Sequence, residues 1–167
     1  MIKQNKQFYT LLQKYEQAFW RVAITYEVNP ALREELFQEI IFEIWKSLEG
    51  FENRSSKKTY IYRVAHNVAF RHVNKQTRIR SHRTNNLEKK TSVSLEIDYQ
   101  NKQEIDLLAS AIQKLPIHQR EIISLALEGL TYPEISEIVG ISESNVGVIL
   151  NRSKKRIREI MEKNNGK

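Results

Sequence analysis

Cysteine is absent from this sequence of 167 residues, which excludes disulfide bonds and metal sites built on thiolates. Glycine is scarce, with 5 residues at positions typical of caps and turns, and neither a glycine-rich phosphate loop nor a nucleophile elbow occurs. No apolar run approaches the ~20 residues that span a bilayer. The opening stretch "MIKQNKQFYTLLQKYEQ" lacks the apolar segment of a secretory signal. Together these absences favour a cytoplasmic protein.

Positive charge is abundant and unevenly distributed, and the net charge is +7. Residues 51–90 carry 11 basic and 2 acidic side chains, and residues 152–167 carry 7 basic and 2 acidic side chains. Between them, residues 91–151 carry 3 basic and 9 acidic side chains. Two separated basic blocks indicate two contacts with a polyanion. A solvated helix face plus a solubilising tail is the plainer alternative, but each block adjoins a distinct structural signal, which favours the polyanion.

The first part of the chain has the apolar spacing of helices. Asn29 and Pro30 suit the cap and first turn of a second helix over residues 31–48, which Gly50 ends. A polar loop over residues 51–58 precedes a third helix that runs from about Thr59 to near Arg78. The first helix is predicted from residues at spacings of three and four: Phe8, Leu11, Leu12, Tyr15, Phe19, Val22 and Tyr26.

Residues 78–101 are polar, without helical periodicity, and read as a flexible linker. Helical patterns then return, with a capping box formed by Thr131 and Glu134 at the start of a short helix. Gly140 closes that helix and Ser142 caps the last one. The sequence therefore predicts an all-α protein with two small helical domains, residues 1–77 and 102–167, joined by the linker.

A short helix, a turn with glycine and a Ser-capped longer helix are typical of a helix-turn-helix. In the last helix an apolar face is expected to pack on the preceding helices, while the opposite face meets base edges first and phosphates later. Gly147 permits close approach and Val148 suits a thymine methyl. The predicted DNA-contacting residues, called the −35 set below, are Ser142, Ser144, Asn145, Val148, Asn151, Arg152 and Lys155.

Two stretches resemble regions 2 and 4 of bacterial sigma factors. Residues 34–73 contain an acid, Gln-Glu, an aromatic residue and Trp, followed by a loop and the helix "IYRVAHNVA", which is similar to the family's "LYRIARN-A". Residues 115–159, "LPIHQREIISLALEGLTYPEISEIVGISESNVGVILNRSKKRIRE", resemble region 4. Because only a bare linker separates them, the chain resembles the group 4, or extracytoplasmic-function (ECF), sigma factors.

The resemblance implies a dissociable initiation subunit of RNA polymerase. Region 2 of the family docks on the clamp helices of core polymerase, then recognises and melts the −10 promoter element, while region 4 binds the −35 element and the polymerase flap. An anti-sigma factor is a usual partner. The implied polymerase-binding residues, called the docking face below, are Glu35, Gln38, Glu39 and Phe42. The implied −10 set is Phe51, Asn53, Arg54, Tyr60, Arg63, His66 and Asn67.

Two other classes of protein compete with this interpretation. A helix-turn-helix regulator that binds operators without polymerase explains residues 115–159 but gives the patterns in residues 35–45 and 60–67 no role. An enzyme is disfavoured because His66 and His72 are six residues apart and do not share a helical face, and no acid stands at metal-ligand spacing to either. We therefore expect no catalytic residue, metal or cofactor, and no insertion into a membrane.

Overall fold

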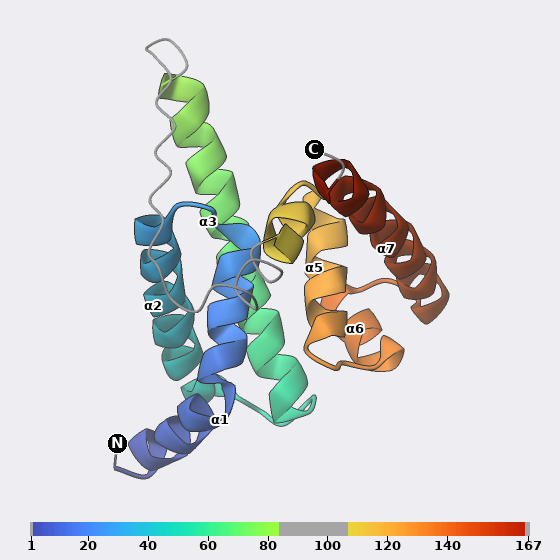
Figure 1. The fold of residues 1–167 in the computed structure, drawn as a ribbon. Helices are drawn as coiled ribbons and strands as arrows, with labels where there is room; N and C mark the ends of the chain where they lie inside the picture. Colours follow the sequence, from blue (N-terminus) through green and yellow to red (C-terminus); the bar gives the residue numbers. More distant parts are fainter. Residues whose placement is uncertain (1, 84–106, 166–167) are drawn as a thin grey trace.

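The structure is a computed structural model that describes residues 2–83 and 107–165. Within these ranges the chain is helical and contains no strand (Figure 1). Residues 107–113 form a further short helix. The other elements are α1 (Ile2–Tyr26), α2 (Pro30–Ser47), the 3₁₀ turn η1 (Leu48–Gly50), α3 (Lys57–Arg83), α5 (Ile117–Leu127), α6 (Tyr132–Val139) and α7 (Glu143–Asn165). The expected all-α class is confirmed.

The N-terminal unit consists of α1, α2 and α3 packed on one another. The Asn29 side chain caps α2 as predicted, since its carboxamide oxygen accepts hydrogen bonds from the backbone N–H groups of Ala31 and Leu32. The predicted apolar stripe of α1 supplies part of the core, and apolar residues of α2 and α3 supply the rest. Its fully buried side chains include Phe19, Val22, Leu36, Ile40, Ile44, Ile61 and Val68.

Two helix boundaries differ from those expected. α2 ends at Ser47, one residue before the expected end, and Leu48–Gly50 form a tighter turn. α3 continues to Arg83, beyond the expected end near Arg78. The first residues of the predicted linker, 78–83, are therefore helical, and residues 84–101 lie outside the described part of the chain. The division into domains 1–77 and 102–167 remains a prediction.

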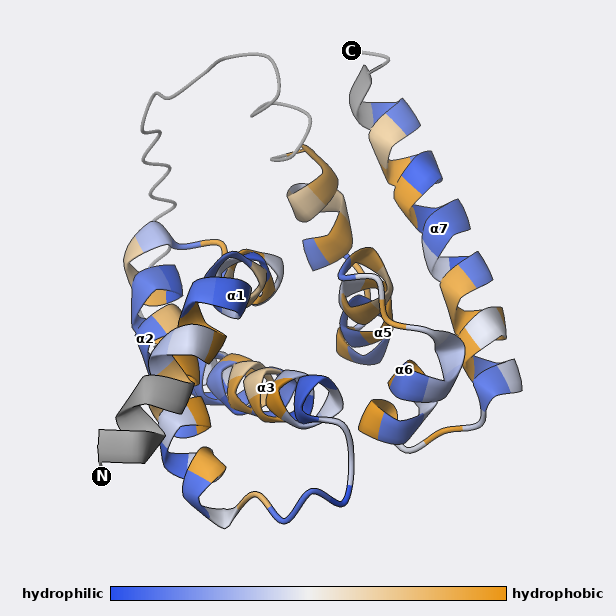
Figure 2. Ribbon diagram, turned by 90° about the horizontal axis from the view of Figure 1, so that it is seen from below, coloured by the Kyte–Doolittle hydropathy of each residue, from blue (hydrophilic) through white to orange (hydrophobic). Residues whose placement is uncertain are grey.

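The C-terminal unit consists of α5, α6 and α7, and the apolar residues of α7 lie mainly on the side towards α5 (Figure 2). Two glycines with positive φ end its first two helices: Gly129 at +74° and Gly140 at +76°, a conformation that costs glycine little. The predicted capping box is present, because Thr131 Oγ1 accepts from the Glu134 N–H and the Glu134 carboxylate accepts from the Thr131 N–H. Local sequence signals thus set both turns.

The Thr131→Ala substitution is expected to destabilise the protein by about 1 kcal/mol, because it removes the side-chain half of this box. Urea unfolding followed by circular dichroism measures the loss, with Thr77→Ala, an exposed position within α3, as the control that changes stability by less than about 0.5 kcal/mol. The backbone and side-chain hydrogen bonds from Thr131 lower the pKa of Glu134. The contribution of the Glu134 carboxylate to the stability of the fold is therefore fully present above the ordinary glutamate pKa, and it is lost as the pH falls below that value. Equal stability of the Thr131→Ala and Thr77→Ala variants would contradict the role of Thr131 as a cap.

The two helical units lie side by side in both ribbon views (Figures 1 and 2). α3 contacts α5 and α6, and α1 contacts α5. In the described ranges, no helix combines the length and apolar character required to cross a membrane. The arrangement leaves one face of α2 and one face of α7 uncovered, and these faces carry two of the predicted sites.

Candidate nucleic-acid and partner-binding surfaces

The docking face is an exposed strip along α2. Its residues are spaced at i, i+3, i+4 and i+7, so they share one side of the helix. Leu36, Ile40 and Ile44 are buried on the other side against α1 and α3. Glu35, Gln38 and Glu39 are exposed, and Phe42 keeps 55% of its surface in contact with solvent. An exposed aromatic beside two carboxylates is suited to binding a partner that carries apolar and basic groups.

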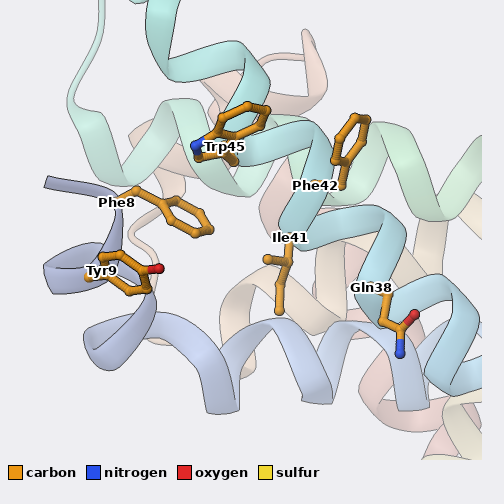
Figure 3. A pocket seen from close by; sticks show the side chains of 6 residues that line it. All are labelled: Phe8, Tyr9, Gln38, Ile41, Phe42 and Trp45. Atoms are coloured by element: carbon orange, nitrogen blue, oxygen red, sulfur yellow. The ribbon is translucent and has the colours of Figure 1, made fainter. Parts of the chain in front are cut away.

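An apolar groove of about 370 Å³ continues the docking face towards the start of α1. Figure 3 shows Phe8 and Tyr9 of α1 approaching Ile41 and Trp45 of α2, with Gln38 and Phe42 further along the same helix. Tyr9 is 64% exposed. Sequence reasoning assigned Phe8 to the core stripe and missed the groove. The adjacent aromatic pair Phe8–Tyr9 was the available signal, because neighbouring side chains of a helix point about 100° apart and Tyr9 lies outside the apolar stripe that contains Phe8.

Part of the −10 set forms an aromatic corner between η1 and α3. The rings of Phe51 and Tyr60 have centroids 4.7 Å apart, and the Tyr60 hydroxyl donates to the Ser47 carbonyl at 3.0 Å. Asn53 is exposed with φ of +57°, a left-handed conformation that asparagine tolerates. Arg54 is exposed and forms an ion pair with the exposed Glu52, at 2.6 Å. Half-buried rings beside an exposed amide and cation can stack and hold an unpaired base.

The remaining −10 residues on α3 differ in their accessibility. Asn67 is exposed. Arg63 is half-buried and donates to the Glu137 carbonyl of α6 at 2.8 Å. The assignment of His66 to the DNA surface is contradicted by this structure, because His66 is 1% exposed and its Nδ1 is hydrogen-bonded to the Tyr26 hydroxyl at 2.9 Å. Burial lowers the pKa of His66 to about 3, so the imidazole is neutral at physiological pH.

His72 is also a structural residue. Its Nε2 lies 2.9 Å from the Glu27 carboxylate, and both side chains are buried. Although burial alone would raise it, the pKa of Glu27 is lowered by hydrogen bonds from His72 and from the Asn29 N–H. The pair joins the end of α1 to the middle of α3.

A second, basic groove runs along the far half of α3, with a volume of about 510 Å³. It is lined by Arg71, Asn74, Lys75, Arg78 and Ile79. None of these residues belongs to the predicted sets, although the charge of residues 51–90 indicated them as a block. A groove lined by three cations on one helix is suited to a phosphate backbone.

Six residues of the −35 set lie on α7, and Ser142 directly precedes this helix. All seven of its residues are exposed, while Val146, Leu150, Ser153 and Ile157 are buried on the opposite face. Ser142 caps the helix by accepting from the Asn145 N–H. The packing of α7 also favours glycine at position 147, because a Cβ there would lie 3.3 Å from the ring of Tyr132. The exposed face combines small polar groups with Arg152 and Lys155, as a recognition helix requires.

Comparisons with known protein families match both halves of the chain. Residues 11–79 match Sigma-70 region 2, and residues 105–157 match Sigma-70, region 4. The chain belongs to the sigma-70 family. Because it combines regions 2 and 4 and its curated relatives include an ECF sigma factor, it is an alternative sigma factor of the ECF type that directs transcription.

Two curated relatives come from Bacillus subtilis (strain 168). The ECF RNA polymerase sigma factor SigX is 27% identical over 165 residues, which cover 93% of this chain and 84% of SigX. The RNA polymerase sigma factor SigV is 28% identical over 150 residues, which cover 89% of this chain and 87% of SigV.

Two solved structures share the fold. The sigma factor RpoE from Bartonella quintana, crystallised with the anti-sigma factor NepR, has a TM-score of 0.78 at 21% identity over 94% of this chain and 98% of RpoE. CnrH, in complex with the cytosolic domain of CnrY, has a TM-score of 0.69 at 16% identity over 95% of this chain and 89% of CnrH.

Proposed function

We propose that this sigma factor binds core RNA polymerase through the docking face, opens the −10 element with the aromatic corner, and holds the −35 element with α7. The observation that carries the proposal is that these three groups of residues lie on separate, accessible surfaces: α2, the η1–α3 corner and α7. Each surface has the chemistry of its task. An operator-binding regulator would use α7 alone.

The aromatic corner supplies what an unpaired base needs. Melting a duplex costs the stacking of the bases, and stacking a flipped base on an aromatic ring recovers about 1–3 kcal/mol. Tyr60 is fixed by its bond to Ser47, and its ring supports that of Phe51. Because the rings are held in place before DNA binds, binding costs little side-chain conformational entropy. Asn53 and Arg54 then provide polar contacts beside the trapped base.

α7 holds the duplex mainly through its phosphates. Arg152 and Lys155 follow the polar first turns of α7 and are exposed, in the order expected for base contacts followed by phosphate contacts. Val148, 44% exposed, supplies an apolar contact for a thymine methyl. The basic residues Arg152 and Lys155 therefore set the affinity of α7 for duplex DNA, and the first turns of the helix set its register on the base pairs.

We infer further partners from the relatives. Both solved structures are complexes, one with an anti-sigma factor and one with the cytosolic domain of CnrY, and an anti-sigma factor is accordingly expected to sequester this chain in the cytoplasm. The catalytic groups for RNA synthesis belong to core polymerase, so the sigma factor itself acts without a catalytic residue or cofactor.

A promoter template that is already unpaired around the −10 element separates the melting of the −10 element from the binding of the −35 element. The Tyr60→Leu variant is expected to lose about tenfold or more of its transcription from a duplex promoter, because a base can no longer stack there. It is expected to recover most of that activity on a template already unpaired around the −10 element. Tyr15→Leu, an aromatic on the core side of α1, is the control for a loss caused by folding. A Tyr60→Leu defect of equal size on both templates would contradict a role in melting.

A further inference from the structure

A tyrosine of α6 occupies the space that a side chain at position 147 of α7 would fill. Gly147 lies one helical turn after Ser144 and one turn before Asn151, so it stands within the −35 set. A Cβ at Gly147 would lie 3.3 Å from Cε2 of the Tyr132 ring and 4.0 Å from Cδ2. The recognition helix therefore has no side chain at this position, and the ring of Tyr132 covers it instead.

The start of α6 holds this ring beside the predicted DNA surface. Tyr132 is the first residue of α6, and it follows the Thr131 cap and precedes Pro133. The capping box and the fixed φ of proline restrict the backbone on both sides of the tyrosine. α6 packs beside the start of α7 (Figure 1). In a helix-turn-helix the first helix crosses the DNA backbone while the second enters the major groove, so a side chain where the two helices meet lies next to the groove.

The ring of Tyr132 is also accessible to a ligand. Tyr132 keeps 47% of its surface exposed, and Val148, the residue after Gly147, keeps 44%. Both apolar groups border a glycine that adds no side chain of its own, and the exposed residues around them include Ser144 and Asn145. The C5 methyl group of thymine is the apolar feature that base pairs present in the major groove. Two exposed apolar groups on this face are therefore suited to thymine methyl groups.

We propose that Tyr132 is a specificity-determining residue for the −35 element, and that its ring contacts the C5 methyl group of a thymine next to the one contacted by Val148. The inference rests on the proposed binding of the −35 element by α7, and it adds a residue of α6 to that surface. Tyr132 lies outside the predicted −35 set, because spacing within the last helix does not show a ring that reaches it from α6. The contact uses the ring and does not require the phenol hydroxyl.

The packing of the ring on Gly147 can be tested without DNA. Gly147→Ala has two opposing effects, because alanine favours a helix more than glycine does, whereas its Cβ presses on the Tyr132 ring. In a Tyr132→Ala background only the first effect remains. Gly147→Ala is therefore expected to raise the urea midpoint of unfolding in Tyr132→Ala, and to raise it less or to lower it in the wild type. Equal changes in the two backgrounds would overturn the proposal, since the ring would not occupy position 147.

Removal of single methyl groups from the DNA measures the contact itself. The probe is a promoter duplex at which wild-type holoenzyme initiates transcription, with each thymine of the −35 element replaced in turn by deoxyuridine. Replacement at two neighbouring positions is expected to weaken wild-type binding about threefold each, roughly the effect of one methyl group. Tyr132→Ala holoenzyme is expected to be insensitive to replacement at one of these positions, and Val148→Ala holoenzyme at the other. A folding defect would not remove the sensitivity at a single position.

Two further variants serve as controls. Tyr132→Phe is expected to keep the methyl sensitivity of the wild type, and so is Leu127→Ala, which changes an exposed apolar residue of α5. A Tyr132→Ala variant as sensitive as the wild type at every thymine would overturn the proposal. The same holds for a Tyr132→Phe variant that behaved like Tyr132→Ala, because the hydroxyl would then make the contact. Wild-type holoenzyme that initiated at no promoter would instead remove the proposed function, and this inference with it.

Discussion

The double charge reversal Glu35→Lys/Glu39→Lys is expected to weaken binding to bacterial core RNA polymerase by about a hundredfold, since like charges placed across a complementary interface cost several kcal/mol. Both carboxylates are exposed on one face of α2, one helical turn apart. Neither side chain is part of the core, so the fold is expected to remain intact. Fluorescence anisotropy of labelled sigma factor titrated with core polymerase gives the dissociation constants.

The matched control is Glu16→Lys/Glu49→Lys, which changes the net charge equally at two exposed positions outside the docking face. Circular dichroism spectra establish that both double variants are folded. If the docking-face variant and the control bound core polymerase equally well, α2 would not be the polymerase-binding surface.

The Arg152→Ala/Lys155→Ala variant is expected to bind −35 duplex roughly thirtyfold more weakly near physiological salt, because each phosphate contact releases about 0.9 of a counterion from B-DNA. Both side chains are exposed on the outer face of α7. The plot of log affinity against log salt concentration is expected to become shallower by about 2 units of slope. The deficit is therefore largest at low salt and shrinks as salt is added.

The measurement uses holoenzyme and a duplex that carries the −35 element, so that the sigma factor is assayed in its working state. Lys46→Ala/Lys114→Ala removes two exposed cations outside α7 and is expected to keep the slope of the wild type. A parallel shift of the Arg152→Ala/Lys155→Ala line, with its slope unchanged, would show that neither side chain contacts phosphate.

Most of the local structure could be predicted because its causes are local. Asn29, Thr131 and Gly140 act on backbone groups within a few residues, so their roles are visible in a short stretch of sequence. The same holds for the −35 set, whose exposure follows from the helical spacing of the buried Val146 and Leu150. The end of α3 was missed because its last turns are polar and carry no apolar stripe.

What could not be predicted depends on contacts between residues far apart in the chain. His66 is buried because Tyr26, 40 residues away, closes over it, and helical spacing alone does not say which face of α3 is covered. The pair of Arg21 and Glu128 joins residues 107 positions apart. In the sequence alone, each residue resembles an ordinary surface charge, and only the packing of α1 against α5 brings the two side chains together.

Run-off transcription from a genomic promoter library, with bacterial core polymerase in the presence and absence of this chain, tests the central claim most directly. Defined start sites that appear only when the chain is present are the predicted result, and the sequences upstream of them would reveal what Val148 and its neighbours on α7 contact. Identical transcripts with and without the chain, together with no stable complex on core polymerase, would contradict its role as a sigma factor.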